Sequence, residues 1–253
     1  MILDAFCLKG KVAIVTGCDT GLGQGMALAL AEAGCDVVGV NRKIPHDTAA
    51  KINALGRRFI AIQADLSQQD AINGVVTQAV AAFGQVDILV NNAGTIRRQD
   101  ALEFSEKDWD DVMNLNLKSV FFLSQAVARQ FMAQRGGGKI INIASMLSFQ
   151  GGIRVPSYTA SKSGVLGITR LLANEWAAQG INVNAIAPGY MATNNTQQLR
   201  EDSERNQAIV DRIPAGRWGT PDDLKGPVVF LASQASDYIN GYTLAVDGGW
   251  LAR

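Results

Sequence analysis

Short apolar runs alternate with longer helical periods along the chain, and this alternation limits the folds that the sequence can adopt. Seven runs read as strands: residues 11–16, 37–40, 59–62, 86–90, 139–143, 181–186 and 242–246. Most of them are nearly continuous in apolar character, which is typical of parallel strands that are buried on both faces of a sheet. The segments 22–33, 47–55 and 71–83, which separate the first four runs, have helical periodicity.

Strands that alternate with helices predict right-handed crossover connections and a parallel sheet. We therefore expect the α/β class, with a single doubly wound (Rossmann) domain whose seven-stranded parallel sheet carries helices on both faces. The 253 residues contain no Ser/Pro/Gly-rich linker, repeat or low-complexity tract, so we expect residues 1–253 to form one domain. Ligands of such folds bind at the carboxyl ends of the strands.

Charge and hydropathy exclude several classes of partner. Lys+Arg and Asp+Glu number 23 each, so no basic field favours nucleic acid or an anionic membrane. No run approaches the roughly 18 apolar residues that a membrane span needs. The first six residues carry Asp4 and no basic residue, unlike a secretory signal, so a cytoplasmic location is expected.

Cysteine and histidine are too few and too scattered for several kinds of chemistry. Cys7, Cys18 and Cys35 form no CxxC pair, which indicates reduced thiols without a disulfide framework or zinc site. His46 is the only histidine and lies in a polar run. We expect no metal site, and any acid–base catalysis must use another side chain.

A glycine-rich turn follows the first predicted strand and opens the first helix. Glycines at this place allow helix N-terminal amides to approach a pyrophosphate. The spacing is G-x-x-x-G-x-G, which differs from the commonest dinucleotide fingerprint. A turn that serves only packing is the alternative. The candidate cofactor-binding residues here are Gly17, Asp19, Thr20, Gly21, Leu22 and Gly23.

The ends of the next three strands offer further cofactor contacts. Asn41 and Arg42 follow the second strand, where an acid would favour NAD and an arginine NADP, so the choice stays open. Asp65, followed by Leu66, could accept from the adenine amino group or could cap the next helix. The fourth strand ends in a turn whose candidate residues are Asn91, Ala93 and Gly94.

Tyr158 and Lys162 lie four residues apart, so on a helix both side chains project from one face. A lysine ammonium beside the phenol favours phenolate, which would make the tyrosine a general acid–base without histidine. Ser145 follows a strand and could bond the same substrate oxygen. Asn116 interrupts an apolar helical run, where asparagine is unfavourable, so it could anchor a water linked to Lys162. Each of these residues also has a purely structural alternative. Tyr158 and Lys162 could be an ordinary pair on a helix surface. Ser145 could be only a turn residue, and Asn116 could hydrogen-bond its own backbone.

Taken together, these motifs make the chain resemble the short-chain dehydrogenase/reductase family over nearly its whole length. The resemblance rests on T-G-x-x-x-G-x-G at 16–23, N-N-A-G at 91–94, Asn116, Ser145, Y-x-x-x-K at 158–162, and Pro188-Gly189 with Thr193. It implies NAD or NADP, an Asn–Ser–Tyr–Lys tetrad that acts on a carbonyl/alcohol pair, and a homotetramer or dimer. It also implies that Lys162 bonds the nicotinamide ribose beside Tyr158, and that Pro188, Gly189 and Thr193 lie near the carboxamide.

The likeness is closest to family members that act on deoxy sugar acids in bacterial uronate and pectin breakdown, carried by the stretches 17–21, 144–156, 192–196 and 247–250. Those members mostly use NAD, which favours NAD here with NADP as the alternative. A sugar acid needs a cation for its carboxylate, and arginine matches a carboxylate with two parallel hydrogen bonds. Arg154 or Arg97 is the expected partner, with Ser145 and Gln150 also at the substrate.

Several alternatives remain open from the sequence. The chain could be a gluconate 5-dehydrogenase-like or 3-oxoacyl reductase-like enzyme, or a dinucleotide sensor without catalysis. The polar segment 193–213 predicts a lid over the substrate or a plain pair of surface helices. Apolar residues at 166, 171, 172 and 176 exceed what one core face needs, and the resemblance suggests that they form a subunit interface.

Overall fold

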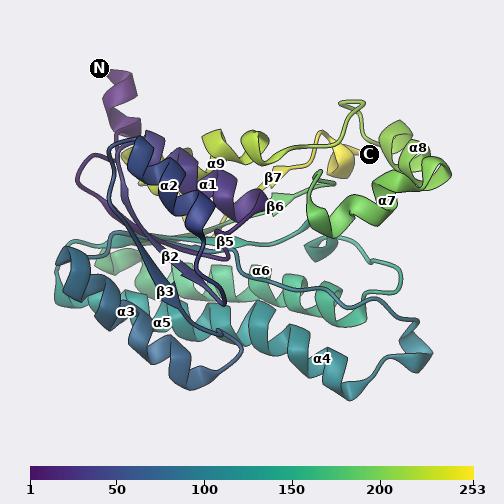
Figure 1. Cartoon of the computed structure of the whole chain (residues 1–253), viewed down its shortest axis with the longest axis horizontal. Helices are drawn as coiled ribbons and strands as arrows, with labels where there is room; N and C mark the ends of the chain where they lie inside the picture. Colours follow the sequence, from purple (N-terminus) through teal and green to yellow (C-terminus); the bar gives the residue numbers. More distant parts are fainter.

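All seven predicted strands form in the computed structural model, which describes residues 1–253, and they make one sheet (Figure 1). The strands are β1 (Val12–Thr16), β2 (Asp36–Asn41), β3 (Phe59–Gln63), β4 (Ile88–Asn91), β5 (Gly138–Ile143), β6 (Ile181–Pro188) and β7 (Thr243–Val246). Their order in the sheet is β3-β2-β1-β4-β5-β6-β7, and every neighbouring pair is parallel. The predicted doubly wound fold is confirmed.

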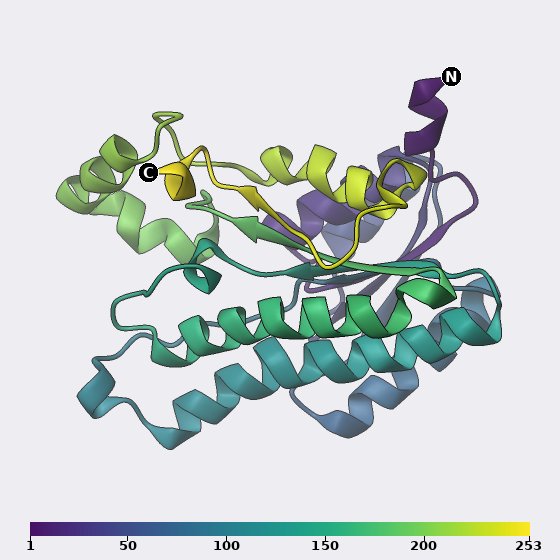
Figure 2. The same cartoon turned by 180° about the vertical axis from the view of Figure 1, so that it is seen from behind.

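Helices cover both faces of this sheet, as expected for parallel strands joined by crossovers. They are α1 (Gly21–Glu32), α2 (His46–Ala54), α3 (Gln69–Phe83), α4 (Glu106–Met113), α5 (Ser119–Ala133), α6 (Pro156–Trp176), α7 (Gln197–Glu201), α8 (Ser203–Arg212) and α9 (Lys225–Ala232). Helices α1, α2 and α9 lie on one face, and α3, α5 and α6 lie on the other (Figures 1 and 2). The three helices predicted from periodicity each form within two residues of the expected bounds.

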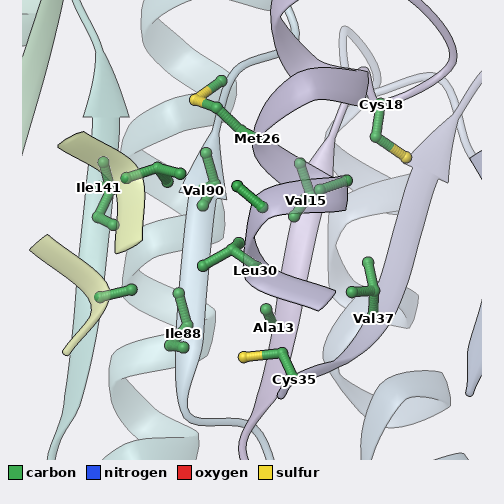
Figure 3. Packing of buried hydrophobic residues seen from close by; sticks show 14 of the residues in the cluster. Ala13, Val15, Cys18, Met26, Leu30, Cys35, Val37, Ile88, Val90 and Ile141 are labelled. Atoms are coloured by element: carbon green, nitrogen blue, oxygen red, sulfur yellow. The ribbon is translucent and has the colours of Figure 1, made fainter. Parts of the chain in front are cut away.

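The core is split by the sheet into two apolar layers. On one side, Met26 and Leu30 of α1 pack over β1 and β4 (Figure 3). On the other side, Leu123 and Phe131 of α5 pack over the opposite face of the sheet. Every residue of β1 is buried, which explains why its run is apolar at each position rather than at alternate ones.

The order of strands reverses at β1 and β4: the chain adds strands on one side of β1 up to β3 and on the other side from β4 onward. Hydrogen bonds join the carboxyl ends of these two strands. The backbone amides of Asn92 and Ala93 donate to Thr16 Oγ1 at 3.0 and 2.9 Å. The Asn92 side-chain amide donates to the carbonyl oxygens of Thr16 and Gly17, each at 2.9 Å. A doubly wound sheet binds its ligands in the crevice at such a switch point.

The predicted lid segment forms α7 and α8, which project beyond the carboxyl ends of β5 and β6 (Figure 1). The predicted surplus of apolar residues on α6 is mostly wrong. Leu166 and Leu172 are buried in the chain's own core, Trp176 packs against that core, and Leu171 is exposed. None of the helices combines the length and the apolar character needed to cross a membrane.

Candidate active site

A cleft of about 1450 Å³ lies at the carboxyl edge of the sheet and continues under α8. It brings together most of the residues predicted from the sequence. Those that line it are Gly17, Asp19, Thr20, Gly21, Leu22, Gly23, Asn41, Arg42, Asp65, Leu66, Ala93, Gly94, Ser145, Gln150, Arg154, Tyr158, Lys162, Pro188, Gly189 and Thr193. Three predicted residues, Asn91, Arg97 and Asn116, do not line the cleft.

The glycine turn leaves the first amides of α1 open toward the cleft. Thr20 is the N-cap of α1, but its side chain caps no amide, whereas Ser105 and Asp202 cap α4 and α8. A Cβ on Gly23 would lie 2.0 Å from the carbonyl oxygen of Gly17, so only glycine allows this close approach. Uncapped amides and a positive helix end suit a pyrophosphate, and the turn therefore fits a dinucleotide.

The second strand ends in an uncharged polar pair rather than an acid. Asn41 is buried and donates from Nδ2 to the Cys18 sulfur at 3.3 Å, while its Oδ1 has no donor. Arg42 and Lys43 line the cleft beside it. A buried acceptor without a donor suits a hydroxyl of a bound ribose, and the two cations suit a phosphate. The residues at this end of the cleft thus fit either dinucleotide.

Asp65 keeps both roles that the sequence left open. Its Oδ1 accepts from the backbone amide and the hydroxyl of Ser67 at 3.0 and 2.8 Å, as a turn residue does. The side chain is nevertheless exposed at the cleft edge, where its second oxygen can still accept a hydrogen bond.

Asn91 lies inside the protein instead of in the cleft. Its side-chain amide donates to Ser124 Oγ at 3.0 Å and to Asn142 Oδ1 at 2.9 Å, which links β4 to α5 and β5. The neighbouring Asn92 lines the cleft and was not singled out by the sequence. The two asparagines differ only in which way the strand end points them, and their identical residue type carries no signal of that direction.

Tyr158 and Lys162 both face the cleft from the first two turns of α6, as the four-residue spacing predicts. Lys162 Nζ lies 5.8 Å from the centroid of the Tyr158 ring and donates to the Ile143 carbonyl at the end of β5 at 2.5 Å. This bond fixes the ammonium between the helix and the sheet. The burial of Lys162 lowers its pKa to about 8, because burial disfavours the charged form.

Burial also sets the pKa of Tyr158, and the direction differs from the one predicted from the lysine alone. Desolvation raises the pKa of Tyr158 above its usual value, while the neighbouring Ser145 hydroxyl and the charge of Arg98 act in the opposite direction. Burial therefore favours the protonated form of the phenol. A protonated phenol can donate to a carbonyl oxygen, which is the role that a reduction requires.

Ser145 lies at the N-cap of the short 3-10 turn Met146–Ser148, directly after β5. Its hydroxyl oxygen accepts from the Leu147 amide at 3.1 Å, so the side chain is held and its own O–H stays available for the cleft. Ser148 adds a second tie by donating to the Lys162 carbonyl at 2.6 Å. The bond from Ser148 holds the Met146–Ser148 turn, and with it Ser145, against α6, the helix that carries Tyr158.

Asn116 lies in a π-helical turn, Asn114–Lys118, between α4 and α5. The residue is fully buried, and its amide clasps the segment after β4: Oδ1 accepts from Thr95 N at 2.8 Å and Nδ2 donates to Thr95 O at 2.9 Å. Nδ2 also donates to Ser161 Oγ at 3.3 Å. Both N–H donors are thus used by the protein, and the predicted water-anchoring role of Asn116 stays a prediction. Single π-helical turns are frequent at functional sites.

Replacing Asn116 by alanine should destabilise the protein by about 2–3 kcal/mol, because two partly buried backbone groups of Thr95 lose their partners. The thermal midpoint should then fall by roughly 4–10 °C, measured by calorimetry. Asn114→Ala in the same π-helical turn is the matched control, since the Asn114 side chain makes no hydrogen bond; it should change stability by less than about 0.5 kcal/mol. Equal losses of stability in Asn116→Ala and Asn114→Ala would show that the hydrogen bonds between Asn116 and Thr95 do not stabilise the protein.

The two arginines predicted to hold a carboxylate already have acidic partners. Arg97 lies outside the cleft, where it pairs with Asp108 and Asp111 of α4 at 3.3 and 3.4 Å. Arg154 is at the cleft rim and pairs with Asp100 at 3.2 Å, although both side chains are more than half exposed. The structure therefore does not bring Arg97 to the substrate side, and it offers Arg154 only as a paired, solvent-screened cation.

Several residues that the sequence did not single out also line the cleft. They come from the segments after β4 and β6, from α8 and from the C-terminal turn: Arg98, Tyr190, Arg205, Arg212 and Trp250. The adjacent pair Arg97–Arg98 was a usable signal for Arg98. Tyr190 follows the predicted pair Pro188-Gly189 at the end of β6, whereas no local pattern marks Arg205, Arg212 and Trp250, because these three reach the cleft only through the packing of α8 and the C-terminal turn.

A family model described as enoyl-(acyl carrier protein) reductase matches residues 17–251. A protein from Escherichia coli named 2-dehydro-3-deoxy-D-gluconate 5-dehydrogenase is 74% identical over 253 residues, and the match covers all of both chains. The comparison therefore includes every cleft residue named above.

Solved structures agree with the sequence comparisons. A protein from Agrobacterium tumefaciens, described as a 2-deoxy-D-gluconate 3-dehydrogenase with bound NADP, is 56% identical, with a TM-score of 0.94 over 99% of this chain and 100% of that one. A gluconate 5-dehydrogenase from Burkholderia cenocepacia, in complex with NADP and tartrate, is 38% identical, with a TM-score of 0.95 over all of both chains. This chain belongs to the short-chain dehydrogenase/reductase family, whose members are NAD(P)-dependent oxidoreductases.

Proposed function

We propose that this protein is a 2-dehydro-3-deoxy-D-gluconate 5-dehydrogenase, which interconverts a C5 hydroxyl and a C5 ketone on a 3-deoxy sugar acid. The observation that carries the proposal is the Tyr158–Lys162–Ser145 group at the bottom of a cleft that also holds the glycine turn. The relative from E. coli that bears this name matches the whole chain at 74% identity. The gluconate 5-dehydrogenase that is solved with tartrate supports an anionic substrate.

In the proposed reduction, Tyr158 donates its phenolic proton to the C5 oxygen while Ser145 donates a hydrogen bond to the same atom. The bound nicotinamide supplies the hydride to C5, so that the ketone becomes a secondary alcohol. Lys162, held by the Ile143 carbonyl, places a positive charge beside the phenolate that remains and stabilises it. Oxidation uses the same groups in reverse. Asn116 acts as a positioning residue through Thr95 and Ser161.

We propose that NAD is the preferred dinucleotide and that NADP is also accepted. Asn41 offers an uncharged acceptor for the adenosine ribose, which suits the two hydroxyls of NAD. Arg42 and Lys43 at the same edge can pair with the additional phosphate of NADP. Asp19, Thr20 and the first amides of α1 would hold the pyrophosphate region, and Pro188, Gly189 and Thr193 would border the nicotinamide.

The setting of the enzyme is part of the proposal. A homotetramer in the cytoplasm that serves uronate and pectin breakdown follows from the family resemblance. All three cysteines are free, and two of them are buried, as suits a reducing compartment. Exposed apolar side chains on α5 and α6, Met132 and Leu171, supply surface for subunit contacts.

Initial rates with NADH and NADPH on a panel of ketones test this function. The 5-keto form of a 3-deoxy sugar acid should exceed a neutral ketone of the same length by at least tenfold in kcat/KM, the smaller end of the range for hydrogen bonds to a charged group. NADH should be used better than NADPH, with both active.

Other outcomes of the panel identify the alternatives. Preferential reduction of a 3-oxoacyl thioester would replace the sugar-acid proposal with a fatty-acyl reductase. Faster turnover of gluconate-type keto acids that carry a 3-hydroxyl would indicate a gluconate 5-dehydrogenase. Tight dinucleotide binding with no turnover of any ketone would indicate a sensor.

A further inference from the structure

The inner face of α8 presents two arginines to the cleft. Arg205, Ala208, Ile209 and Arg212 all line it. Their spacing of i, i+3, i+4 and i+7 places them on one side of the helix, with the arginines about 10 Å apart along its axis. Neither guanidinium makes an ion pair with an acid of the chain. Two uncompensated cations on the covering helix of an enzyme cleft point to an anionic group on the substrate.

Arg212 is the more rigid of the two. Its guanidinium carbon lies 4.0 Å from the centroid of the Trp250 ring, and a stacked guanidinium keeps its edge N–H groups free for a carboxylate. The backbone carbonyl of Arg212 accepts from the Arg253 side chain at 2.7 Å, which holds this end of α8 against the C-terminal turn. Both arginines are exposed, but Arg205 makes no comparable contact with an aromatic ring.

Trp250 supplies a second, independent observation. It is 4% exposed and lines the cleft, yet its indole Nε1–H has no acceptor in the protein. A buried donor without an acceptor is unfavourable, so native proteins rarely keep one without a reason. Trp250 also shares an apolar cluster with Met146, the residue that follows Ser145, so it belongs to the substrate side of the cleft and not to the dinucleotide side.

We propose that Arg212 and the Nε1–H of Trp250 bind the carboxylate of the substrate, with Arg212 as the residue that determines specificity for an acid. This inference rests on the proposed function, because it takes the substrate to be a sugar acid. Arg154 and Arg97 are less suited, since each already pairs with an aspartate. Arg98 donates to the Asn195 carbonyl at 3.2 Å and acts on Tyr158 instead.

The test compares the keto sugar acid with its primary carboxamide, which has the same shape and no charge. Arg212→Met should raise KM for the acid about 10- to 100-fold with kcat little changed, the range for a lost hydrogen bond to a charged group. For the carboxamide the same variant should change kcat/KM less than about threefold. Arg212→Lys should fall between the wild type and Arg212→Met, because lysine keeps the charge but not the planar fork.

Two further variants separate this subsite from its neighbours. Trp250→Phe keeps a smaller aromatic ring and removes the N–H donor, so it should raise KM for the acid several-fold and raise KM for the carboxamide by a smaller factor, because a neutral amide oxygen is the weaker acceptor. Arg205→Met on the same helix should have a smaller effect on the acid than Arg212→Met. A larger effect of Arg205→Met, or equal losses of acid and carboxamide in Arg212→Met, would overturn the assignment.

The same measurements distinguish an error in the proposed function from an error in the assignment of Arg212. If the substrate is not a sugar acid, the wild-type protein itself will not prefer the acid to the carboxamide. If the wild type does prefer the acid and Arg212→Met keeps that preference, the function stands and the subsite is wrong.

Discussion

Tyr158→Phe should lower kcat by about three orders of magnitude while the protein still binds NADH, because general acid–base catalysis typically contributes 10²- to 10⁴-fold. The substitution removes only the phenolic oxygen, and that oxygen makes no hydrogen bond to the chain beyond its interaction with Ser145. The thermal midpoint should therefore fall by no more than about 4 °C, since one intramolecular hydrogen bond contributes about 1 kcal/mol. Stopped-flow reduction of the keto acid and fluorescence titration with NADH measure the two quantities.

Tyr242→Phe is the matched control for the loss of a phenol. The Tyr242 side chain is exposed and lies outside the cleft, so its variant should keep wild-type kcat. Residual activity of Tyr158→Phe above about one tenth of the wild type would show that another group transfers the proton. Loss of NADH binding in the same variant would show that the phenol is needed for the dinucleotide rather than for chemistry.

Gly23→Ala should destabilise the protein by about 1–3 kcal/mol and weaken NADH binding by about 30-fold or more. The new Cβ would lie 2.0 Å from the Gly17 carbonyl oxygen and 2.4 Å from Asn92 Nδ2, so the backbone of the turn must move. That movement breaks the clamp between Asn92 and the end of β1 and displaces the uncapped amides of α1. A loss of about 2 kcal/mol in binding corresponds to the 30-fold change. Calorimetry and equilibrium titration provide the measurements.

Gly226→Ala controls for the general effect of a methyl group on a helical glycine. Gly226 lies in α9, and a Cβ there would meet no atom within 4 Å. Its variant should be as stable as the wild type or slightly more stable, because alanine favours helix. If Gly23→Ala behaved like Gly226→Ala, the close approach at the glycine turn would not exist in solution.

The features that can be predicted from the sequence are those whose structure depends on residues close together in the chain. A fully apolar run such as β1 indicates a strand buried on both sides, and the order of strands and helices then leaves few topologies. The spacing of Tyr158 and Lys162 determines their common face once α6 forms. The glycines around the start of α1 indicate a close backbone approach, and a Cβ at Gly23 would indeed lie only 2.0 Å from the Gly17 carbonyl oxygen.

The features that could not be predicted are those that depend on contacts between residues far apart in the sequence. Arg97 and Arg98 are neighbours of one type, and the acids of α4 decide which of them turns away from the cleft. Arg212 and Trp250 meet only after α8 has packed against the C-terminal turn. The pKa of Tyr158 also depends on burial that the motif does not encode, and burial outweighs the lowering effects of Ser145 and Arg98. The π-helical turn at Asn116 has no sequence pattern at all.

The strand order has a consequence for how the protein emerges from the ribosome. In the sheet β2 pairs with β1 and β3 with β2, β4 pairs with the other side of β1, and each later strand pairs with the one before it. Every strand from β2 onward therefore finds one neighbour already synthesised, and β1 is the strand whose second neighbour is made long after it. The edge of β1 is open only until β4 follows, within seconds at ordinary rates of synthesis. Open strand edges are where chains aggregate, and after β4 is in place the growing sheet has one fixed edge at β3 and one advancing edge at the newest strand.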